Sequence, residues 1–293
     1  MFLGTCGPDE LYEALLRRDP AFDGWVFVCV TTTGIFCRLT CPARKPRREN
    51  CLYFETVGEC IEAGFRPCRR CNPLNSKDPT TASLLEALEK RPGYRWTEAD
   101  IGALGFDCST VRRAFKRQFG VTFLEMARQR RLREGMKTIS EGGKVIEAQI
   151  DAGFESASAF RAAFSKLLGQ SPRELSTNAA LLVDWIATPL GPMIAASDRE
   201  ALHLLEFVDR KALGAELRAL RQSSDGGLGI GRHSPTEQIE NELNGFFSGR
   251  SASFRTPIAL CGSPFANKVW RALCEIPPGE TRSYAEIASY RRS

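Results

Sequence analysis

The chain has 293 residues, of which 43% are hydrophobic, so it is not globally disordered and has room for two or three domains. No stretch approaches the roughly 18 uninterrupted apolar residues of a membrane span, and the amino-terminal segment lacks the features of a signal peptide. A net charge of +5 is too small by itself to establish a polyanionic partner. We expect a cytoplasmic protein, and without export its eleven cysteines are expected to be reduced thiols, some of them on a metal. An odd number also cannot all pair within one chain.

The first block, residues 1–78, predicts a small α/β domain. The run Trp25–Thr31 is β-branched and aromatic, which is typical of a strand. Residues Thr56–Ala63 favour a short helix that ends at Gly64. Residues 72–79 are rich in Pro, Asn and Ser, which predicts a linker to the next block.

Four cysteines of this block follow the pattern C-x3-C-x26-C-x2-C, with Cys37 and Cys41 as one pair and Cys68 and Cys71 as the other. Two close thiol pairs separated by a small subdomain are the expected ligands of a tetrahedral zinc ion. A four-thiolate zinc site is usually structural. A zinc-bound thiolate also stays deprotonated at neutral pH, however, and can attack an alkyl carbon. The residues therefore leave a structural site and a reactive centre open.

Basic side chains are dense around these four ligands. They either compensate the negative charge of the thiolates on a solvated face or form a phosphate-binding surface beside an electron-rich sulfur. The other cysteines of the block show no second ligand spacing, and we interpret them as small buried hydrophobes. The basic set is Arg38, Arg44, Lys45, Arg47, Arg48, Arg66, Arg69 and Arg70, and the other cysteines are Cys6, Cys29, Cys51 and Cys60.

The second block, residues 81–176, predicts an all-α domain with an internal repeat. Gly105-Phe106 is echoed about 48 residues later by Gly153-Phe154, and in each copy helices precede and follow the glycine turn. This pattern indicates two helix–turn–helix units. The expected cores are Phe106, Val111, Phe115 and Phe119 in the first unit and Phe154, Phe160 and Phe164 in the second.

Basic residues of the second block concentrate around the first unit. A charged helix face is often only solvated, but here it falls on the helix after the turn, where a major-groove reader belongs. The basic set is Arg112, Arg113, Lys116, Arg117, Arg128, Arg130, Arg131, Arg133 and Lys137.

The third block, residues 181–293, predicts a mixed α+β lobe. Trp185–Ala196 indicates a hairpin around a Pro-Leu-Gly-Pro turn, and Leu202–Val208 a further strand. Residues 225–229 are expected to form a loop. The expected helices are 212–221, 235–247, 265–275 and one that begins at 283.

The segments Thr32–Cys41 and Ala63–Pro73 resemble the amino-terminal domain of the Ada family, the bacterial adaptive-response proteins to DNA alkylation. The resemblance implies that Cys37 irreversibly accepts a methyl group from a methylphosphotriester in DNA, while the other three cysteines remain zinc ligands. The spacing alone does not distinguish Cys37 from the others. The family's contacts to the DNA backbone fall on Thr33, Arg44, Arg66 and Arg70.

Residues 85–175 resemble the DNA-binding domain of AraC-type activators, including the closing segment Phe164–Pro172. By this resemblance the residues after each turn are candidate base or phosphate contacts. They are Ser109, Thr110, Arg112, Arg113, Lys116 and Arg117 in the first unit and Ser156, Ala157, Ser158 and Arg161 in the second.

The third block contains the segments Thr188–Gly191, Ser263–Phe265, Lys268–Trp270 and Gly279–Ala288. These segments resemble alkylguanine-DNA alkyltransferases, a family that combines a ribonuclease-H-like lobe with a helical lobe. Tyr284 matches a tyrosine that helps to rotate the target base out of the duplex. The Pro-Cys-His-Arg motif that carries the family's acceptor cysteine is not found, and neither Cys261 nor Cys274 is followed by a histidine. We expect a lobe truncated before that motif and no methyl transfer from O6-methylguanine.

These features together predict a multidomain α+β protein that repairs methylphosphotriesters through Cys37, with Zn²⁺ as cofactor, and activates alkylation-response genes. Double-stranded DNA is the expected partner, RNA polymerase is a further candidate, and no membrane is involved. A monomer associated with the bacterial nucleoid is expected, because two tandem motifs can bind successive grooves. The alternatives are a transcription factor with a purely structural zinc site and an inactive truncated relative.

Overall fold

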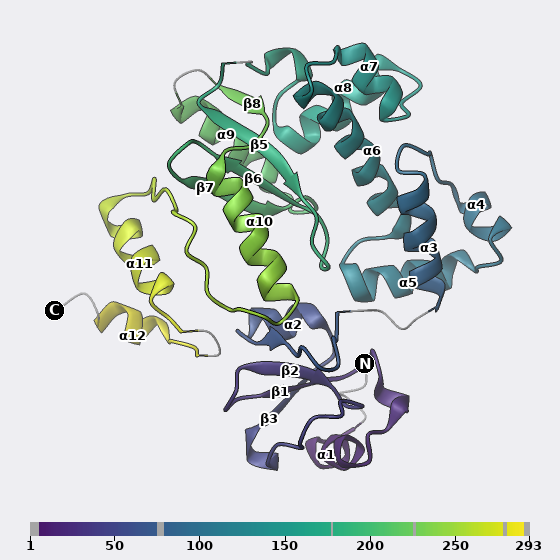
Figure 1. Ribbon diagram of the computed structural model, residues 1–293, viewed down its shortest axis with the longest axis vertical. Coiled ribbons are helices and arrows are strands. Elements are labelled where there is room, and N and C mark those ends of the chain that lie inside the picture. The colour runs from purple at the N-terminus through teal and green to yellow at the C-terminus, as the bar shows by residue number, and fades with distance from the viewer. Residues whose placement is uncertain (1–5, 75–78, 177, 225–226, 278–279, 290–293) are drawn as a thin grey trace. The chain divides into compact units, whose positions relative to one another are not determined.

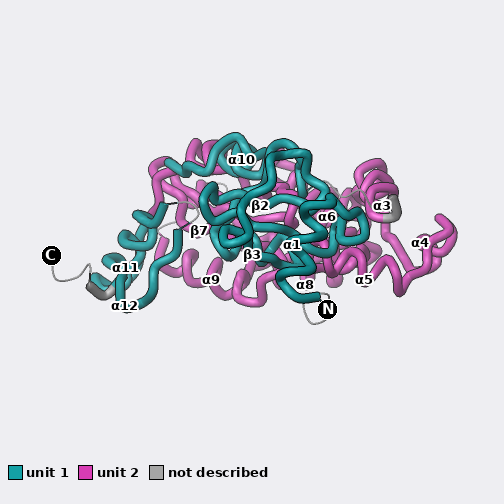
Figure 2. Tube along the Cα trace, turned by 90° about the horizontal axis from the view of Figure 1, so that it is seen from below, with its two compact units in different colours: residues 1–77, 241–255, 260–293 teal, residues 78–240, 256–259 magenta. Residues whose placement is uncertain are grey.

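The computed structural model describes residues 6–74, 79–176, 178–224, 227–277 and 280–289, which form a mixed α/β protein with two small sheets and many helices (Figure 1). Contacts divide the chain into two compact units (Figure 2). One comprises residues 1–77, 241–255 and 260–293, and the other residues 78–240 and 256–259. Among the helices of the described segments, none has both the length and the hydropathy that a bilayer crossing requires.

The first unit contains a four-stranded sheet in the order β3-β1-β2-β4. β1 (Phe27–Val30) and β2 (Ile35–Arg38) form an antiparallel hairpin. β3 (Cys51–Phe54) pairs antiparallel with β1, whereas β4 (Arg66–Pro67) pairs parallel with β2. The strand predicted around residues 25–31 is therefore confirmed.

Two helices bury opposite faces of this sheet, because successive strand residues alternate between its faces. Val28 and Cys37 share a core with Leu11 and Leu15 of α1 (Pro8–Arg17), a helix that sequence inspection had not identified. Phe36 shares a second core with α2 (Val57–Glu62). The predicted helix 56–63 is confirmed as α2, and the Thr56 hydroxyl caps it by accepting a hydrogen bond from the Glu59 amide.

The non-ligand cysteines of this unit divide into two groups. Cys29 and Cys60 are fully buried in the second core, as expected. Cys6 and Cys51 pack against the first core, as expected of small hydrophobes, but are only half-buried. Cys51 begins β3, which is an edge strand of the sheet in the described residues.

The second unit begins with six helices that confirm the predicted repeat. Gly105 and Gly153 both adopt the left-handed conformation, with φ of 84° and 62°. In each turn the next residue closes the same hydrogen bond, from Phe106 N–H to Ile101 O and from Phe154 N–H to Gln149 O. The helices are α3 (Pro79–Lys90), α4 (Glu98–Ala103), α5 (Cys108–Phe119), α6 (Phe123–Ser140), α7 (Val145–Asp151) and α8 (Ala157–Leu168).

The predicted phenylalanine cores are also confirmed. Val111 and Phe115 are buried in the first motif, and Phe160 and Phe164 in the second, while Phe106, Phe119 and Phe154 are partly buried against them. The core of the second motif continues into the sheet that follows. One cluster joins α8 to β5 (Leu181–Ile186), β6 (Met193–Ser197) and α9 (Leu213–Ser223).

This second sheet has the order β7-β6-β5-β8 and confirms the predicted hairpin and third strand. The predicted loop 225–229 is wrong at its end, because residues 228–230 form strand β8, parallel to β5. Two glycines flank Leu228, so local propensity favoured a loop, and only the pairing with β5 makes the segment extended. From residue 181 onward, the described helices and strands are, in chain order, β5 (Leu181–Ile186), β6 (Met193–Ser197), β7 (Leu202–Phe207), α9 (Leu213–Ser223), β8 (Leu228–Ile230), α10 (Ser234–Phe247), α11 (Pro264–Cys274) and α12 (Tyr284–Ser289).

Arg131 corrects the sequence-based view of the basic stretch on α6. It is 8% exposed and donates hydrogen bonds to the carbonyls of Ala152, at 2.8 Å, and Gly153. Its guanidinium also lies 4.4 Å from the ring centroid of Phe154. The side chain therefore joins the long helix of the first motif to the turn of the second and does not belong to a DNA-facing surface.

An Arg131→Met substitution should lower the free energy of unfolding by about 2–4 kcal/mol, because two buried carbonyls lose their donor. Arg128→Met, on the exposed side of the same helix, is the matched control and should change stability by less than about 0.5 kcal/mol. Urea unfolding of both variants, followed by circular dichroism, measures the difference. Equal midpoints would show that the contacts of Arg131 do not stabilise the pair of motifs.

Candidate metal centre and nucleic-acid interface

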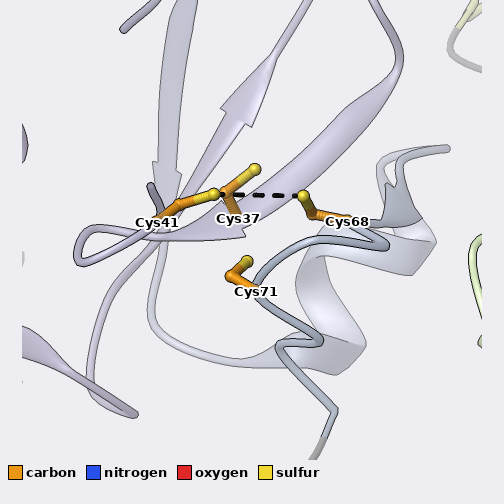
Figure 3. A group of neighbouring side chains, drawn as sticks. All are labelled: Cys37, Cys41, Cys68 and Cys71. Carbon is orange, nitrogen blue, oxygen red and sulfur yellow. Dashed lines mark hydrogen bonds between the residues drawn. The ribbon is translucent and has the colours of Figure 1, made fainter. Parts of the chain in front are cut away.

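Four cysteine thiols converge in the first unit (Figure 3). Cys37 lies in β2, Cys41 in the loop after it, Cys68 directly after β4, and Cys71 in the next turn. All four sulfurs lie within 4.8 Å of one another, and the Cys41 and Cys68 sulfurs are 4.0 Å apart. A tetrahedral zinc ion with Zn–S bonds of about 2.3 Å places its sulfurs about 3.8 Å apart. The donor set and its dimensions therefore fit zinc.

The parallel pairing of β4 with β2 brings the two thiol pairs together. The Cys68 amide donates to the Phe36 carbonyl at 2.9 Å, which places Cys68 beside Cys37. The Asn72 amide then donates to the Cys68 carbonyl at 3.0 Å and turns Cys71 back toward the cluster. Asn72 adopts a left-handed φ of 40°, which asparagine tolerates better than most residues.

Asp23 supports the loop between the first two ligands, Cys37 and Cys41. Its carboxylate accepts a hydrogen bond from Arg38 and another from the Thr40 hydroxyl, both at 3.3 Å. Arg38 is only 4% exposed. The interpretation of Arg38 as part of a phosphate-binding surface is therefore wrong, because the side chain is turned inward to Asp23.

The four thiols perturb one another's pKa values. The neighbouring Cys37 thiol lowers the pKa of Cys41 to about 6 and also lowers the pKa of Cys68. The pKa of Cys37 is correspondingly raised, first of all by its hydrogen bond with Cys41. Such a cluster is poised to exchange its remaining protons for a metal ion.

Exposure by itself does not single out a reactive sulfur. Cys37 is 9% exposed, compared with 4% for Cys41 and 8% for Cys68, and Cys71 is more exposed than any of these. The geometry therefore identifies the cluster. The assignment of Cys37 as the methyl acceptor still depends on the resemblance of the surrounding sequence to the Ada family.

The predicted DNA contacts of the first unit lie on its surface in most cases. Thr33, in the turn between β1 and β2, and Arg44 and Arg70, in the two ligand loops, are exposed. Arg66 is half-buried, and its guanidinium donates to the Gly249 carbonyl at 3.0 Å.

The predicted contacts on α5 lie on the side opposite its core. Ser109, Thr110, Arg112, Arg113 and Lys116 are exposed, and Arg117 is half-buried. Several of them already have partners. Arg112 pairs with Glu98 at 2.8 Å, and the Ser109 hydroxyl donates to Asp107 at 2.7 Å.

Asp107 is a residue that the sequence interpretation missed. It caps α5 by accepting a hydrogen bond from the Thr110 amide, and the Ser109 and Thr110 contacts lower its pKa to about 2. The first turn of α5 therefore carries a fixed carboxylate, and the basic side chains of that helix lie further along it.

The second motif presents a much less basic helix. Ser156, Ser158 and Arg161 are exposed on or next to α8. Ser156 is the cap of that helix, since its hydroxyl accepts a hydrogen bond from the Ala159 amide. Arg161 is the one basic candidate predicted there, so we expect α5 to contribute more of the electrostatic attraction to DNA.

Comparisons with known proteins agree with both sites. Residues 10–73 match the family model of the metal-binding domain of Ada, and residues 102–178 match that of a helix-turn-helix domain. The bifunctional transcriptional activator/DNA repair enzyme Ada of Escherichia coli strain K12 is 30% identical over 297 residues, which cover 96% of this chain and 81% of that protein. The chain belongs to the Ada family.

Parts of this Ada-family chain resemble further proteins. A methylated-DNA–protein-cysteine methyltransferase of Methanosarcina barkeri is 35% identical over 105 residues, which cover 36% of this chain and 61% of that protein. The refined structure of the DNA methyl phosphotriester repair domain of Escherichia coli Ada is 47% identical, covers 24% of this chain and 76% of that chain, and superposes with a TM-score of 0.22.

Membership of the Ada family and the four-cysteine cluster together confirm the zinc prediction. The four ligands could be found from their spacing, whereas Asp23 could not. Asp23 lies 15 residues before Arg38, in a stretch with no motif, and only the folded loop shows that it supports the ligands.

Tyr284, the predicted base-rotating residue, is the first residue of α12 and is 96% exposed. Three large apolar side chains of α11, those of Phe265, Trp270 and Leu273, are also exposed. In the described residues of this part, no polar partner fixes the Tyr284 ring, and its role stays a prediction.

Proposed function

We propose that this Ada-family protein repairs DNA methylphosphotriesters by irreversible, single-turnover methyl transfer to Cys37 and then acts as a transcriptional activator. The observation that carries the proposal is the convergence of four thiols within 4.8 Å, in a domain that matches the metal-binding domain of Ada. The bifunctional name of the Escherichia coli relative supports the pairing of repair with activation.

In the proposed reaction the Cys37 sulfur donates a lone pair to the methyl carbon of the phosphotriester. The S–C bond forms as the C–O bond breaks, and the bonding electrons return to the phosphate oxygen, which restores the phosphodiester. When bound, zinc keeps the thiols deprotonated at neutral pH, so that no proton has to move in the transfer. The product is a thioether, which is a poor methyl donor.

Methyl transfer would also switch DNA binding. Four thiolates on Zn²⁺ have a net charge of minus two, and conversion of one thiolate into a thioether reduces this to minus one. A negative charge that faces phosphates is removed, so the affinity for DNA should rise. The repair event thereby becomes the signal for activation.

We propose a division into three domains: a methyl-acceptor domain over residues 1–78, an AraC-type domain over 81–176 and an alkyltransferase-like lobe over 181–293. Thr33, Arg44, Arg66 and Arg70 would contact the DNA backbone. The exposed residues of α5 and α8 would read two grooves of a promoter, so that a monomer suffices, with RNA polymerase as a further partner. The sheet β7-β6-β5-β8 would be the ribonuclease-H-like part of the third domain.

A closed four-thiolate site also suits a second function, a transcription factor in which zinc is only structural. The low exposure of Cys37, 9%, favours it. Methyl transfer to the protein separates the two functions.

The prediction that residues 1–293 take no methyl group from O6-methylguanine rests on their side chains. Cys261 and Cys274 are exposed thiols, and neither is followed by a histidine. Both histidines of the chain have other contacts: His203 bonds Asp198 at 2.7 Å, and His233 bonds the Ala180 carbonyl at 3.2 Å.

One experiment tests both parts of the proposal. The protein is incubated with a duplex that carries methylphosphotriesters and, separately, with one that carries O6-methylguanine, and its mass is measured intact and after digestion. We expect one methyl group on Cys37 from the first duplex and none from the second. Retained zinc without any methyl gain from the first duplex would establish the structural alternative, and methyl gain from the second would overturn the negative prediction.

A further inference from the structure

Lys45 lies against the loop that joins the first two ligands. Its ammonium group donates hydrogen bonds to two carbonyls of that loop, at 3.2 Å to Leu39 and 3.4 Å to Cys41. The side chain is half-buried. It therefore lies along the loop and is partly shielded from solvent.

Charges of both signs lie near Lys45. Arg18 donates to the Pro42 carbonyl of the same loop, and Cys41, whose carbonyl Lys45 binds, carries one of the four thiols. Within the described part of the chain, no carboxylate lies within ion-pair distance of Lys45. A desolvated ammonium without a carboxylate partner is costly unless another negative group faces it. The cysteine thiolates are that group.

The hydrogen-bonded carbonyls connect this charge to the geometry of the site. Leu39 lies between the first two ligands and Cys41 is the second of them, so the two bonds from Lys45 hold the segment that joins these ligands. Arg18 donates to the Pro42 carbonyl at 3.3 Å and supports the same loop one residue later. Arg18 is exposed, whereas Lys45 is half-buried and binds the backbone of the ligand Cys41 itself.

We propose that Lys45 is a positioning residue of the methyl-acceptor site, which holds the loop between Cys37 and Cys41 and offsets one negative charge of the four-thiolate centre. The inference deepens the proposed function and rests on it for its role in repair. With Lys45 counted, the centre has a net charge of minus one before transfer and is neutral afterwards. The last net negative charge facing the DNA phosphates is then removed by methylation itself.

Four variants separate the charge of Lys45 from its hydrogen bonds. Lys45→Met removes both, Lys45→Gln keeps a donor without charge, and Lys45→Arg keeps both. Arg47→Met removes one positive charge two residues away, from a side chain that is 84% exposed, and is the matched control. The first measurement is the rate at which zinc passes to a chromophoric chelator. The second is the rate at which methyl iodide, which needs no DNA, methylates Cys37 in the zinc-loaded protein.

We expect Lys45→Met to release zinc about tenfold faster than the unchanged protein, the effect of one charge-assisted hydrogen bond. Its Cys37 should react about threefold faster with methyl iodide, because a partly screened cation no longer withdraws charge from the sulfur. Lys45→Gln should show the faster methylation with a smaller effect on zinc release. Lys45→Arg and Arg47→Met should behave like the unchanged protein.

Equal rates for Lys45→Met and Arg47→Met would overturn the inference. If Lys45→Met does not fold, the pair Lys45→Gln and Lys45→Arg decides, since equal methylation rates in these two would show that the charge has no effect on the sulfur. The proposed function fails separately, if the unchanged protein takes no methyl group from methylphosphotriester DNA while the zinc-release difference persists.

Discussion

A Cys37→Ser variant should take up no methyl group from methylphosphotriester DNA under conditions in which the unchanged protein takes up one. A serine hydroxyl does not ionise near neutral pH, and its oxygen is a far weaker nucleophile toward a methyl carbon than a zinc-bound thiolate. The expected loss is complete within the sensitivity of mass spectrometry. The change also removes one of the four ligands, so the zinc content and protease resistance of the variant are measured alongside its methyl uptake.

Cys51→Ser is the matched control, because Cys51 belongs to the same domain, is half-buried and is not part of the cluster. It should accept the methyl group at the normal rate. Methyl uptake by Cys37→Ser, with the label on Cys41, Cys68 or Cys71, would show that the acceptor has been assigned to the wrong sulfur. The cluster would then still be the reactive centre.

A Cys41→Ser variant should lose zinc and unfold the sheet of the first unit. Cys37, Cys41 and Cys68 are part of the core that α1 covers, Cys71 packs against it, and a bound metal would tie the loop after β2 to the turn after β4. Structural zinc ions supply on the order of 10 kcal/mol to small domains of this kind, more than such a core supplies alone. Metal content and limited proteolysis of residues 6–74 measure the effect.

Removal of zinc from the unchanged protein with a chelator should reproduce this result, and restored zinc should reverse it. The helices α3–α8 provide an internal control, because their cores contain none of the zinc ligands. Stoichiometric zinc and unchanged protease resistance in Cys41→Ser would mean that three ligands suffice to hold the fold. In that case the fourth thiol serves the chemistry and contributes little to stability.

The cysteine spacing predicted the metal site correctly because a metal constrains its ligands locally. Two ligands three or four positions apart must lie in one turn or loop, so each pair can be recognised in a single short stretch of sequence. The glycine turns at Gly105 and Gly153 can be predicted from the sequence for a similar reason, since each requires a left-handed residue within one short segment. Both predictions survive in the structure because they depend on neighbours in the chain.

The burial of individual basic residues could not be predicted from the sequence. Arg38 and Arg131 carry the same charge in the sequence as the arginines around them, and both were counted toward nucleic-acid surfaces. In the structure Arg38 pairs with Asp23 inside the first unit, and Arg131 donates to carbonyls 21 and 22 residues away. An arginine is buried or exposed according to partners that a charge pattern does not contain.

The sequence by itself determined the metal, its four ligands, the repeat of helix–turn–helix units and the family, because these depend on residue types at short, regular spacings. The tertiary structure decided which basic side chains are buried and which groups they contact. It placed β8 beside β5, turned Arg38 and Arg131 inward, and set Lys45 against the loop of Cys37 and Cys41. These arrangements depend on strand pairings and carbonyl partners far away in the chain, whose positions exist only once the chain is folded.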